Sequence, residues 1–187
     1  MFHQYIHQST EKVHEVLQSA INELISLHMF TLTSDFIVLG VLLQEKTEAY
    51  DILASLLPDH ASKRNMMMET IYQLHPPQRN TEIQKVTAAP DANKTLEIAS
   101  KEASRIGDSY IGTDTLLVAL FDPLSGSAAD ILKTTGLTQN QVRKELLKRR
   151  EGNTLTTVDA ESRVNVLKEY TVDLTEQALM GELDPVI

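Results

Sequence analysis

The chain contains 187 residues, of which 42% are hydrophobic and none is cysteine, and its formal net charge is −9. A chain of this length and composition can bury a core without disulfides or metals, which excludes an intrinsically disordered chain and a disulfide scaffold. No stretch approaches the ~20 apolar residues of a membrane helix, and the acidic balance argues against general affinity for nucleic acid or anionic lipid.

The first part of the chain shows helical periodicity from the start. Residues 1–8 have neither the basic start nor the apolar run of a secretory signal peptide, so we expect a cytoplasmic protein. Thr10 is a predicted N-cap, and Ser34 or Thr33 is the predicted cap of the next helix. The helix after Thr10 has an apolar stripe formed by Val13, Leu17, Ala20, Leu24 and Leu27.

Later elements carry the same kinds of signal. Thr113 is a predicted cap for a helix that begins at Asp114, and Thr138 with Gln141 predicts a capping box. The final helix ends in a basic cluster, which we interpret as cations facing the helix macrodipole rather than a binding patch. The cluster consists of Lys144, Lys148, Arg149 and Arg150. Because no alternating run has the length of a β-strand, we predict an all-α fold.

The two halves of the chain are related by an internal repeat. The block LTSDFIVLGVLL (32–43) aligns with IGTDTLLVALFD (111–122), which places Asp35 on Asp114 at a separation of 114 − 35 = 79 residues. The same separation holds upstream and downstream without a gap. Helices this apolar must be covered on nearly all sides, so we predict two four-helix repeats, about eight helices in all, packed about a pseudo-twofold axis.

These repeated blocks resemble the double Clp N-terminal repeat found at the front of the ClpA, ClpB and ClpC AAA+ unfoldases. The resemblance covers about Thr10 to Arg150 and includes the ADIL that follows the second block. In addition, the tail LKEYTVDLTEQALMGELDPVI (167–187) is similar to the segment that leads into the first AAA+ module of those proteins. The resemblance implies that the chain is the front part of a larger hexameric ATPase.

The domain boundaries follow from the repeat and from this resemblance. Residues 1–150 are the predicted double-repeat domain, and residues 151–187 are a linker and the truncated start of an AAA+ module, with the boundary in the polar stretch that begins at Glu151. Within the first domain we predict repeat one over about 10–75, a connector over 76–89, and repeat two over about 90–150.

The resemblance implies two alternative functions. The first is a substrate-recognition domain of a Clp-family chaperone, which binds unfolded or aggregated polypeptide and passes it to the AAA+ ring for unfolding or disaggregation. The second is an adaptor- or phosphoarginine-docking domain of a ClpC-type ATPase subunit of a Clp protease. The connector and the tail look more like ClpB, so we favour the first function.

Cofactor and assembly expectations also rest on the resemblance. It implies ATP and Mg for a hexameric full-length protein. For this chain we expect a monomer with no cofactor, and neither nucleic acid nor membrane as a partner.

Five residues are candidates for contact with substrate or adaptor: Thr10, Asp35, Leu96, Asp114 and Leu116. From the residues alone, the aspartates can stabilise the positive ends of their helices and Thr10 can be only a cap. The resemblance implies that the acids hold cationic or phosphorylated-arginine groups in ClpC-type relatives. It also implies that the residue matched by Thr10, together with acids of the second repeat, handles substrate in ClpB-type relatives.

The family pattern is not complete at these positions. The acid is usually followed by histidine, but here Phe36 and Thr115 follow, so no histidine role carries over. Leu96 and Leu116 fit the core, or a groove between the repeats that accepts apolar segments. The three consecutive methionines at 66–68 fit either core packing or an adaptable surface.

Catalytic signals are weak throughout. The chain has no G-x-x-x-x-G-K-[ST] phosphate loop, no cysteine and no G-x-S-x-G elbow, so we expect no enzymatic activity from it. Three histidines and a glutamate near the start of the chain could bind zinc if they shared one face of a single helix. A small metalloenzyme is therefore a third hypothesis. The predicted N-cap at Thr10 interrupts that helix. We therefore interpret these four residues as solvated polar side chains: His3, His7, Glu11 and His14.

Overall fold

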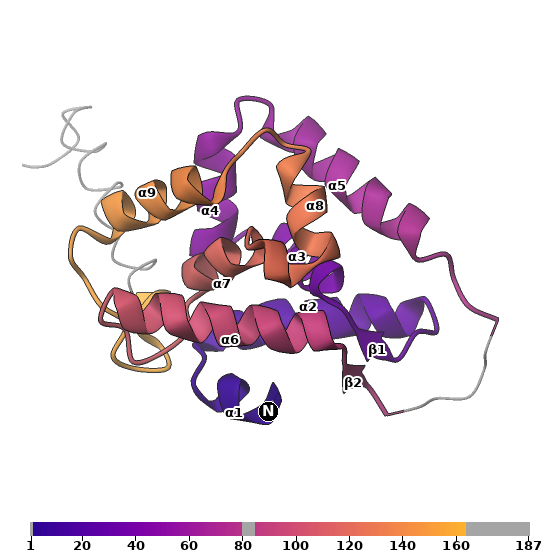
Figure 1. The fold of residues 1–187 in the computed structure, drawn as a ribbon, viewed down its shortest axis with the longest axis horizontal. Coiled ribbons are helices and arrows are strands. Elements are labelled where there is room, and N and C mark those ends of the chain that lie inside the picture. Colours follow the sequence, from indigo (N-terminus) through magenta and orange to yellow (C-terminus); the bar gives the residue numbers. More distant parts are fainter. Residues whose placement is uncertain (1, 80–84, 164–187) are drawn as a thin grey trace, which may run out of the picture.

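The computed structural model describes residues 2–79 and 85–163, and their regular structure is mostly helical (Figure 1). A short helix, α1 (Phe2–His7), precedes the repeats. The first repeat contains α2 (Glu11–Ser26), α3 (Ser34–Leu43), α4 (Glu48–Leu56) and α5 (His60–Leu74). The second contains α6 (Pro90–Arg105), α7 (Thr113–Leu120), the 3-10 helix η1 (Pro123–Ser125), α8 (Ser127–Lys133) and α9 (Gln139–Arg150). The predicted fold class is confirmed.

Most of the predicted helix starts are found, with one shift. The Thr10 hydroxyl accepts a hydrogen bond from the Val13 amide at 3.3 Å, and Thr138 forms the predicted capping box with Gln141. The prediction for α7 was wrong by one residue, because Gly112 is the N-cap and Thr113 is already helical. The Thr113 hydroxyl does not cap α7. It forms hydrogen bonds with residues of other segments, which are described below.

The repeats correspond closely in space as well as in sequence. Both ends of α2 and α6 are separated by the predicted 79 residues. In each repeat the first helix packs against the second, and each second helix also contacts the third helix of the other repeat. Figure 1 shows α3 and α7 in the interior of the molecule.

The core is centred on the two second helices. Every residue of α7 is buried, and all of α3 is buried except its last residue. Helix α3 lies so close to α2 that a Cβ built on Gly40 would be 2.3 Å from the Val16 carbonyl oxygen. Met67 is fully buried in this core, which confirms core packing for the middle methionine.

Two short parallel pairings link the repeats, and neither was predicted from the sequence. Strand β1 (Thr31–Leu32) pairs with β2 (Thr87–Ala88), and an isolated bridge joins Ser9 to Ile111. Each of these two residues lies 79 positions from its equivalent in the Leu32–Ala88 pair. The segment before the first helix of one repeat therefore pairs with the segment before the second helix of the other.

The segment after α9 turns back onto the repeats. Leu155 and Glu161 are each 2% exposed, whereas most of their neighbours between 151 and 163 are exposed or half-buried. The predicted boundary at 151–161 thus falls in residues that contact the repeats. The tail at 167–187 lies outside the described residues.

Candidate functional site

All five residues predicted to contact a partner are buried. Thr10, Leu96 and Leu116 are 0% exposed, and Asp35 and Asp114 are 2% exposed. The leucines belong to the core rather than to an open groove. Direct contact of these side chains with a partner therefore requires a change of conformation.

Asp35 finds its hydrogen-bond donors within its own repeat. Nε2 of His75, at the end of α5, donates to the Asp35 carboxylate at 2.6 Å. The hydroxyl of Thr33 and the amide of Phe36 donate to the other carboxylate oxygen. His75 also packs its ring against Phe36, with ring centroids 4.8 Å apart. Both oxygens of the Asp35 carboxylate therefore have donors from within the first repeat, and the side chain is 2% exposed.

Asp114 has a stronger internal partner. Arg150, the last residue of α9, donates to both of its carboxylate oxygens at 2.6 and 3.0 Å, and the Thr115 amide donates at 2.7 Å. The same guanidinium donates to Asp108 at 3.1 Å. Burial raises the pKa of Asp108 to about 6, against the opposing effect of the Leu155 amide and of Arg150.

Thr10 and Thr113 meet at a third buried acid, Glu161. Both hydroxyls donate to its carboxylate, Thr10 at 2.8 Å, and the Thr113 amide donates at 3.1 Å. The Glu48 amide, at the start of α4, completes the set at 3.4 Å. Burial and the nearby Asp114 charge raise the pKa of Glu161 to about 7.

The sequence pointed to Asp35, Asp114 and Thr10 but not to the side chains that they bind. His75, Arg150 and Glu161 lie 40, 36 and 151 positions from the side chains they bind. No local pattern links residues so far apart. The basic cluster at the end of α9 was the available signal, and its last two members are structural: Arg149 pairs with Glu48, and Arg150 with the acids above.

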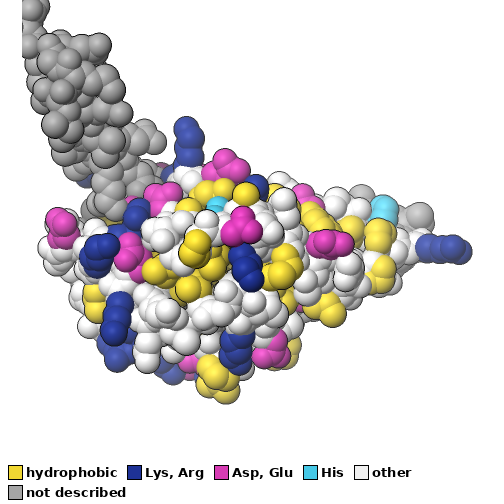
Figure 2. All heavy atoms as spheres, turned by 90° about the horizontal axis from the view of Figure 1, so that it is seen from above, with side chains coloured by type: hydrophobic (Ala, Val, Ile, Leu, Met, Phe, Trp, Pro, Cys, Tyr) yellow, Lys and Arg dark blue, Asp and Glu magenta, His cyan; other side chains and the backbone are white. Residues whose placement is uncertain are grey.

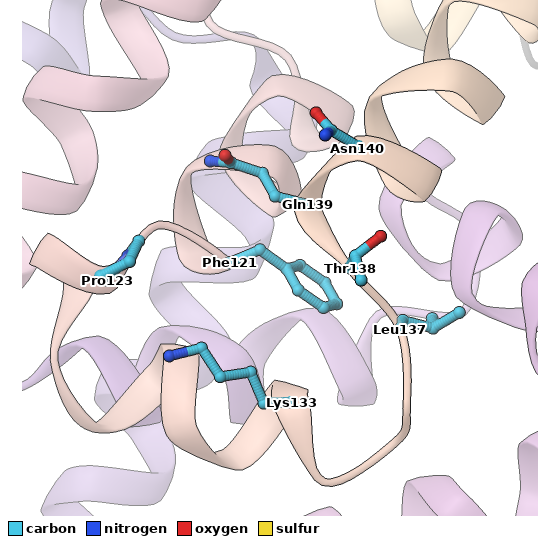
Figure 3. Close-up of a pocket in the computed structure, with 7 residues that line it drawn as sticks. All are labelled: Phe121, Pro123, Lys133, Leu137, Thr138, Gln139 and Asn140. Atoms are coloured by element: carbon cyan, nitrogen blue, oxygen red, sulfur yellow. The ribbon is translucent and has the colours of Figure 1, made fainter.

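The structure does contain a pocket open to solvent, in the second repeat (Figure 3). Its volume is about 440 Å³, and its lining is mainly apolar. In Figure 3 the ring of Phe121 points toward Thr138, and the side chain of Lys133 extends toward Pro123. The lining residues are Phe121, Pro123, Lys133, Leu137, Thr138, Gln139 and Asn140. An apolar side chain carried by a peptide fits this chemistry.

Exposed apolar side chains occur in several parts of the surface. Figure 2 shows hydrophobic side chains in the middle of one face, with acidic and basic side chains interspersed among them. Leu124, which follows the pocket residue Pro123, is 62% exposed. Among the helices of residues 2–79 and 85–163, none combines the length and the apolarity needed to cross a membrane.

The histidine set near the start does not share one helix. Helix α1 ends at His7 and α2 begins at Glu11, and Nε2 of His14 donates to the Ile6 carbonyl at 2.9 Å. Within the described ranges, no group of three or more His, Asp or Glu side chains is placed to hold a metal.

Comparisons with known proteins agree with this geometry. Residues 8–135 match the family model described as "Clp repeat (R) N-terminal domain". Chaperone protein ClpB of Brucella suis is 38% identical over 94 residues, and ClpB of Lactococcus lactis subsp. cremoris is 34% identical over 99 residues. These matches cover 50% and 53% of this chain but only 11% of each relative.

Solved structures match over more of the chain. The Hsp104 N-terminal domain from Candida albicans has a TM-score of 0.71 and 16% identity, covering 82% of this chain and 99% of that one. The N-terminal domain of the ClpV1 ATPase from the E. coli EAEC Sci1 type VI secretion system has a TM-score of 0.61 and 16% identity, covering 75% and 84%. At these identities the likeness shows the fold.

Proposed function

Because the chain belongs to the Clp repeat N-terminal domain family, we propose that it is the substrate-recognition domain of a ClpB-like chaperone. In this role it binds unfolded or aggregated polypeptide and passes it to an AAA+ ring. In this proposal ATP and Mg bind to that ring. The full-length protein is a cytoplasmic hexamer, and this chain alone is a monomer.

The observation that carries the proposal is the apolar pocket of the second repeat. Phe121 and Leu137, which are 3% and 8% exposed, form the apolar base of the pocket, and the exposed Pro123 and Leu124 lie at its edge. Such a surface accepts many bulky apolar side chains without selecting one sequence, as recognition of unfolded chains requires. Lys133, paired with Asp130 at 3.5 Å, adds a polar edge to the pocket.

The alternative, adaptor docking on Asp35 and Asp114, has less support. Both acids are buried, and His75 and Arg150 already occupy the positions that an external cationic group would take. Reversing their charge would place unpaired cations in the core, so this substitution tests stability rather than docking.

The test is a titration of a labelled, permanently unfolded protein into the chain, followed by fluorescence anisotropy. The pocket variant is Lys133→Glu/Asn140→Glu, which adds carboxylates at the pocket edge, where both side chains are exposed. The matched control is Lys144→Glu/Asn22→Glu, which changes the same residue types at exposed positions outside the pocket lining.

We expect saturable binding by the parent chain and the control, and at least several-fold weaker binding by the pocket variant. Absence of saturable binding by the parent chain would refute substrate recognition. Equal binding by all three proteins would move the site away from the pocket.

A further inference from the structure

The two repeats meet at two equivalent junctions, each formed where three helices begin. The first junction lies at the starts of α2, α4 and α7, and we call it the strap junction because residues 151–163 cross it. The second lies at the starts of α3, α6 and α8, and we call it the internal junction. At the strap junction the Thr113 hydroxyl accepts from the Ala49 amide at 3.2 Å. At the internal junction Ser34, the equivalent of Thr113, accepts from the Ala128 amide at 3.4 Å. The positive ends of helices converge at both places.

At each junction one carboxylate accepts hydrogen bonds from the residue at the start of a second helix, but the two carboxylates come from different parts of the chain. At the internal junction Asp91, the second residue of α6, accepts from the Ser34 hydroxyl at 2.9 Å and from the Ser34 amide at 3.2 Å. Its equivalent in the first repeat is Lys12, which pairs with Glu15 at 2.7 Å. The strap junction therefore lacks a carboxylate of its own at that position, and Glu161 from beyond the repeats supplies one.

The segment that delivers Glu161, residues 151–163, is held at few points. Leu155 is buried, its amide donates to Asp108 at 2.6 Å, and its carbonyl accepts from the Ser109 amide at 2.9 Å. The Val158 carbonyl accepts from the Glu11 amide at 2.9 Å. Only Leu155 and Glu161 bury their side chains, so docking depends on two anchors.

Charge at the strap junction is unbalanced. Besides Glu161, two further carboxylates lie in this region, Asp114 of α7 and Asp108 of the preceding loop. A single guanidinium, that of Arg150 in α9, binds both aspartates. From α4, the Glu48 side chain is paired with Arg149. The raised pKa of Glu161 reflects its burial and the nearby charge of Asp114. The repeats gain hydrogen bonds from Glu161 but also gain an excess of negative charge.

We propose that residues 151–163 form a releasable strap, latched by Glu161 at the strap junction, which detaches while the two repeats stay folded. Detachment exposes the Thr10 and Thr113 hydroxyls together with the starts of α2, α4 and α7. It also frees roughly thirteen residues, which can extend about 45 Å. The internal junction differs, because its carboxylate, Asp91, belongs to α6, which is one of the three helices that begin there.

Hydrogen exchange on the unmodified chain gives the first test. The Glu48 and Thr113 amides donate to Glu161, whereas the interior amides of α7 are bonded within that helix. We expect Glu48 and Thr113 to exchange at least tenfold faster than the interior of α7, through an opening that leaves α7 protected. If Glu48, Thr113 and the α7 interior all exchange at one common rate, the strap opens only with global unfolding and the proposal fails.

The second test measures strap position directly. The chain lacks cysteine, so spin labels can be placed through Ser162→Cys on the strap and Asn22→Cys on α2. We expect Glu161→Ala to replace a narrow distance distribution with a broad one while far-UV circular dichroism is unchanged. The control is Asp159→Ala, which removes a carboxylate from the same strap that pairs with Arg163 and should keep the narrow distribution. A narrow distribution in Glu161→Ala, or loss of helicity in that variant, would overturn the latch.

Discussion

Arg150 is the residue on which the buried charges of the second repeat depend. Its guanidinium is the shared partner of Asp108 and Asp114, and all three side chains are at most 9% exposed. A buried ion pair adds little net stability compared with an apolar replacement, but removing one partner leaves the other charge buried and unpaired.

We therefore expect Arg150→Ala to lower the free energy of unfolding by about 3–5 kcal/mol in urea denaturation. The control is Lys148→Ala, since the Lys148 side chain is 78% exposed and its loss should change stability by less than about 0.5 kcal/mol. Adding Asp114→Asn to Arg150→Ala should recover part of the loss. A loss below about 1 kcal/mol in Arg150→Ala would contradict this account of the cluster.

Glu161 should make stability depend on pH. Its pKa is about 7 in the folded chain and 4.5 when unperturbed, so the folded state binds this proton more tightly than the unfolded state. Its contribution to stability is complete below about pH 4.5 and is lost as the pH rises through 7. Asp108, with a pKa of about 6, acts in the same direction.

The measurement is the free energy of unfolding at about pH 5 and about pH 8 for the parent chain and for Glu161→Gln, an interval that spans the raised pKa. We expect the parent to lose more stability than the variant over this interval, because glutamine does not titrate. Comparing the two proteins cancels the groups that they share. An equal loss in both would show that Glu161 titrates alike in the folded and unfolded states.

At the scale of elements, Gly40 sets the distance between α2 and α3. Helix propensity alone favours alanine over glycine by about 1 kcal/mol. The 2.3 Å distance between an added Cβ and the Val16 carbonyl oxygen opposes this preference, because backbone must move to relieve the clash. The equivalent residue, Ala119, shows that α7 and α6 already accommodate a methyl group.

We expect Gly40→Ala to destabilise the fold by about 1–3 kcal/mol, measured by thermal or urea unfolding. Ala119→Gly, made alongside, should cost about 1 kcal/mol because glycine weakens a helix. If Gly40→Ala raised the stability, the contact between α2 and α3 would be looser than the structure indicates.

Local signals predicted the helices well and the links between them poorly. The Thr10 cap and the 79-residue repeat were enough to place α2 and α6. Helix starts and apolar stripes depend on residues that are close in sequence, so local patterns predict them. Strands β1 and β2 have two residues each, too few for any alternation to show. The partners of Asp35 and Asp114 are set by tertiary packing, which periodicity does not encode.

For the whole molecule, the interleaved pairings predict that the repeats remain associated without a covalent connection. Cleavage at a protease site inserted between residues 80 and 84 should leave two pieces that co-elute in size-exclusion chromatography, because the Leu32–Ala88 and Ser9–Ile111 pairs and the contacts of α3 with α7 and α8 cross between repeats. Denaturing urea should separate the pieces. Separate elution under native conditions would mean that the connector, rather than the interface, holds the repeats together.

The same interleaving describes a homodimer contained in one chain. A lone repeat offers two short pairing edges that it cannot satisfy itself, and a second copy satisfies both by twofold exchange. Fusion of two such copies makes the association intramolecular, with an effective concentration in the millimolar range for a short flexible linker. Folding then no longer depends on protein concentration, and the copies are free to diverge, as Lys12 and Asp91 have done.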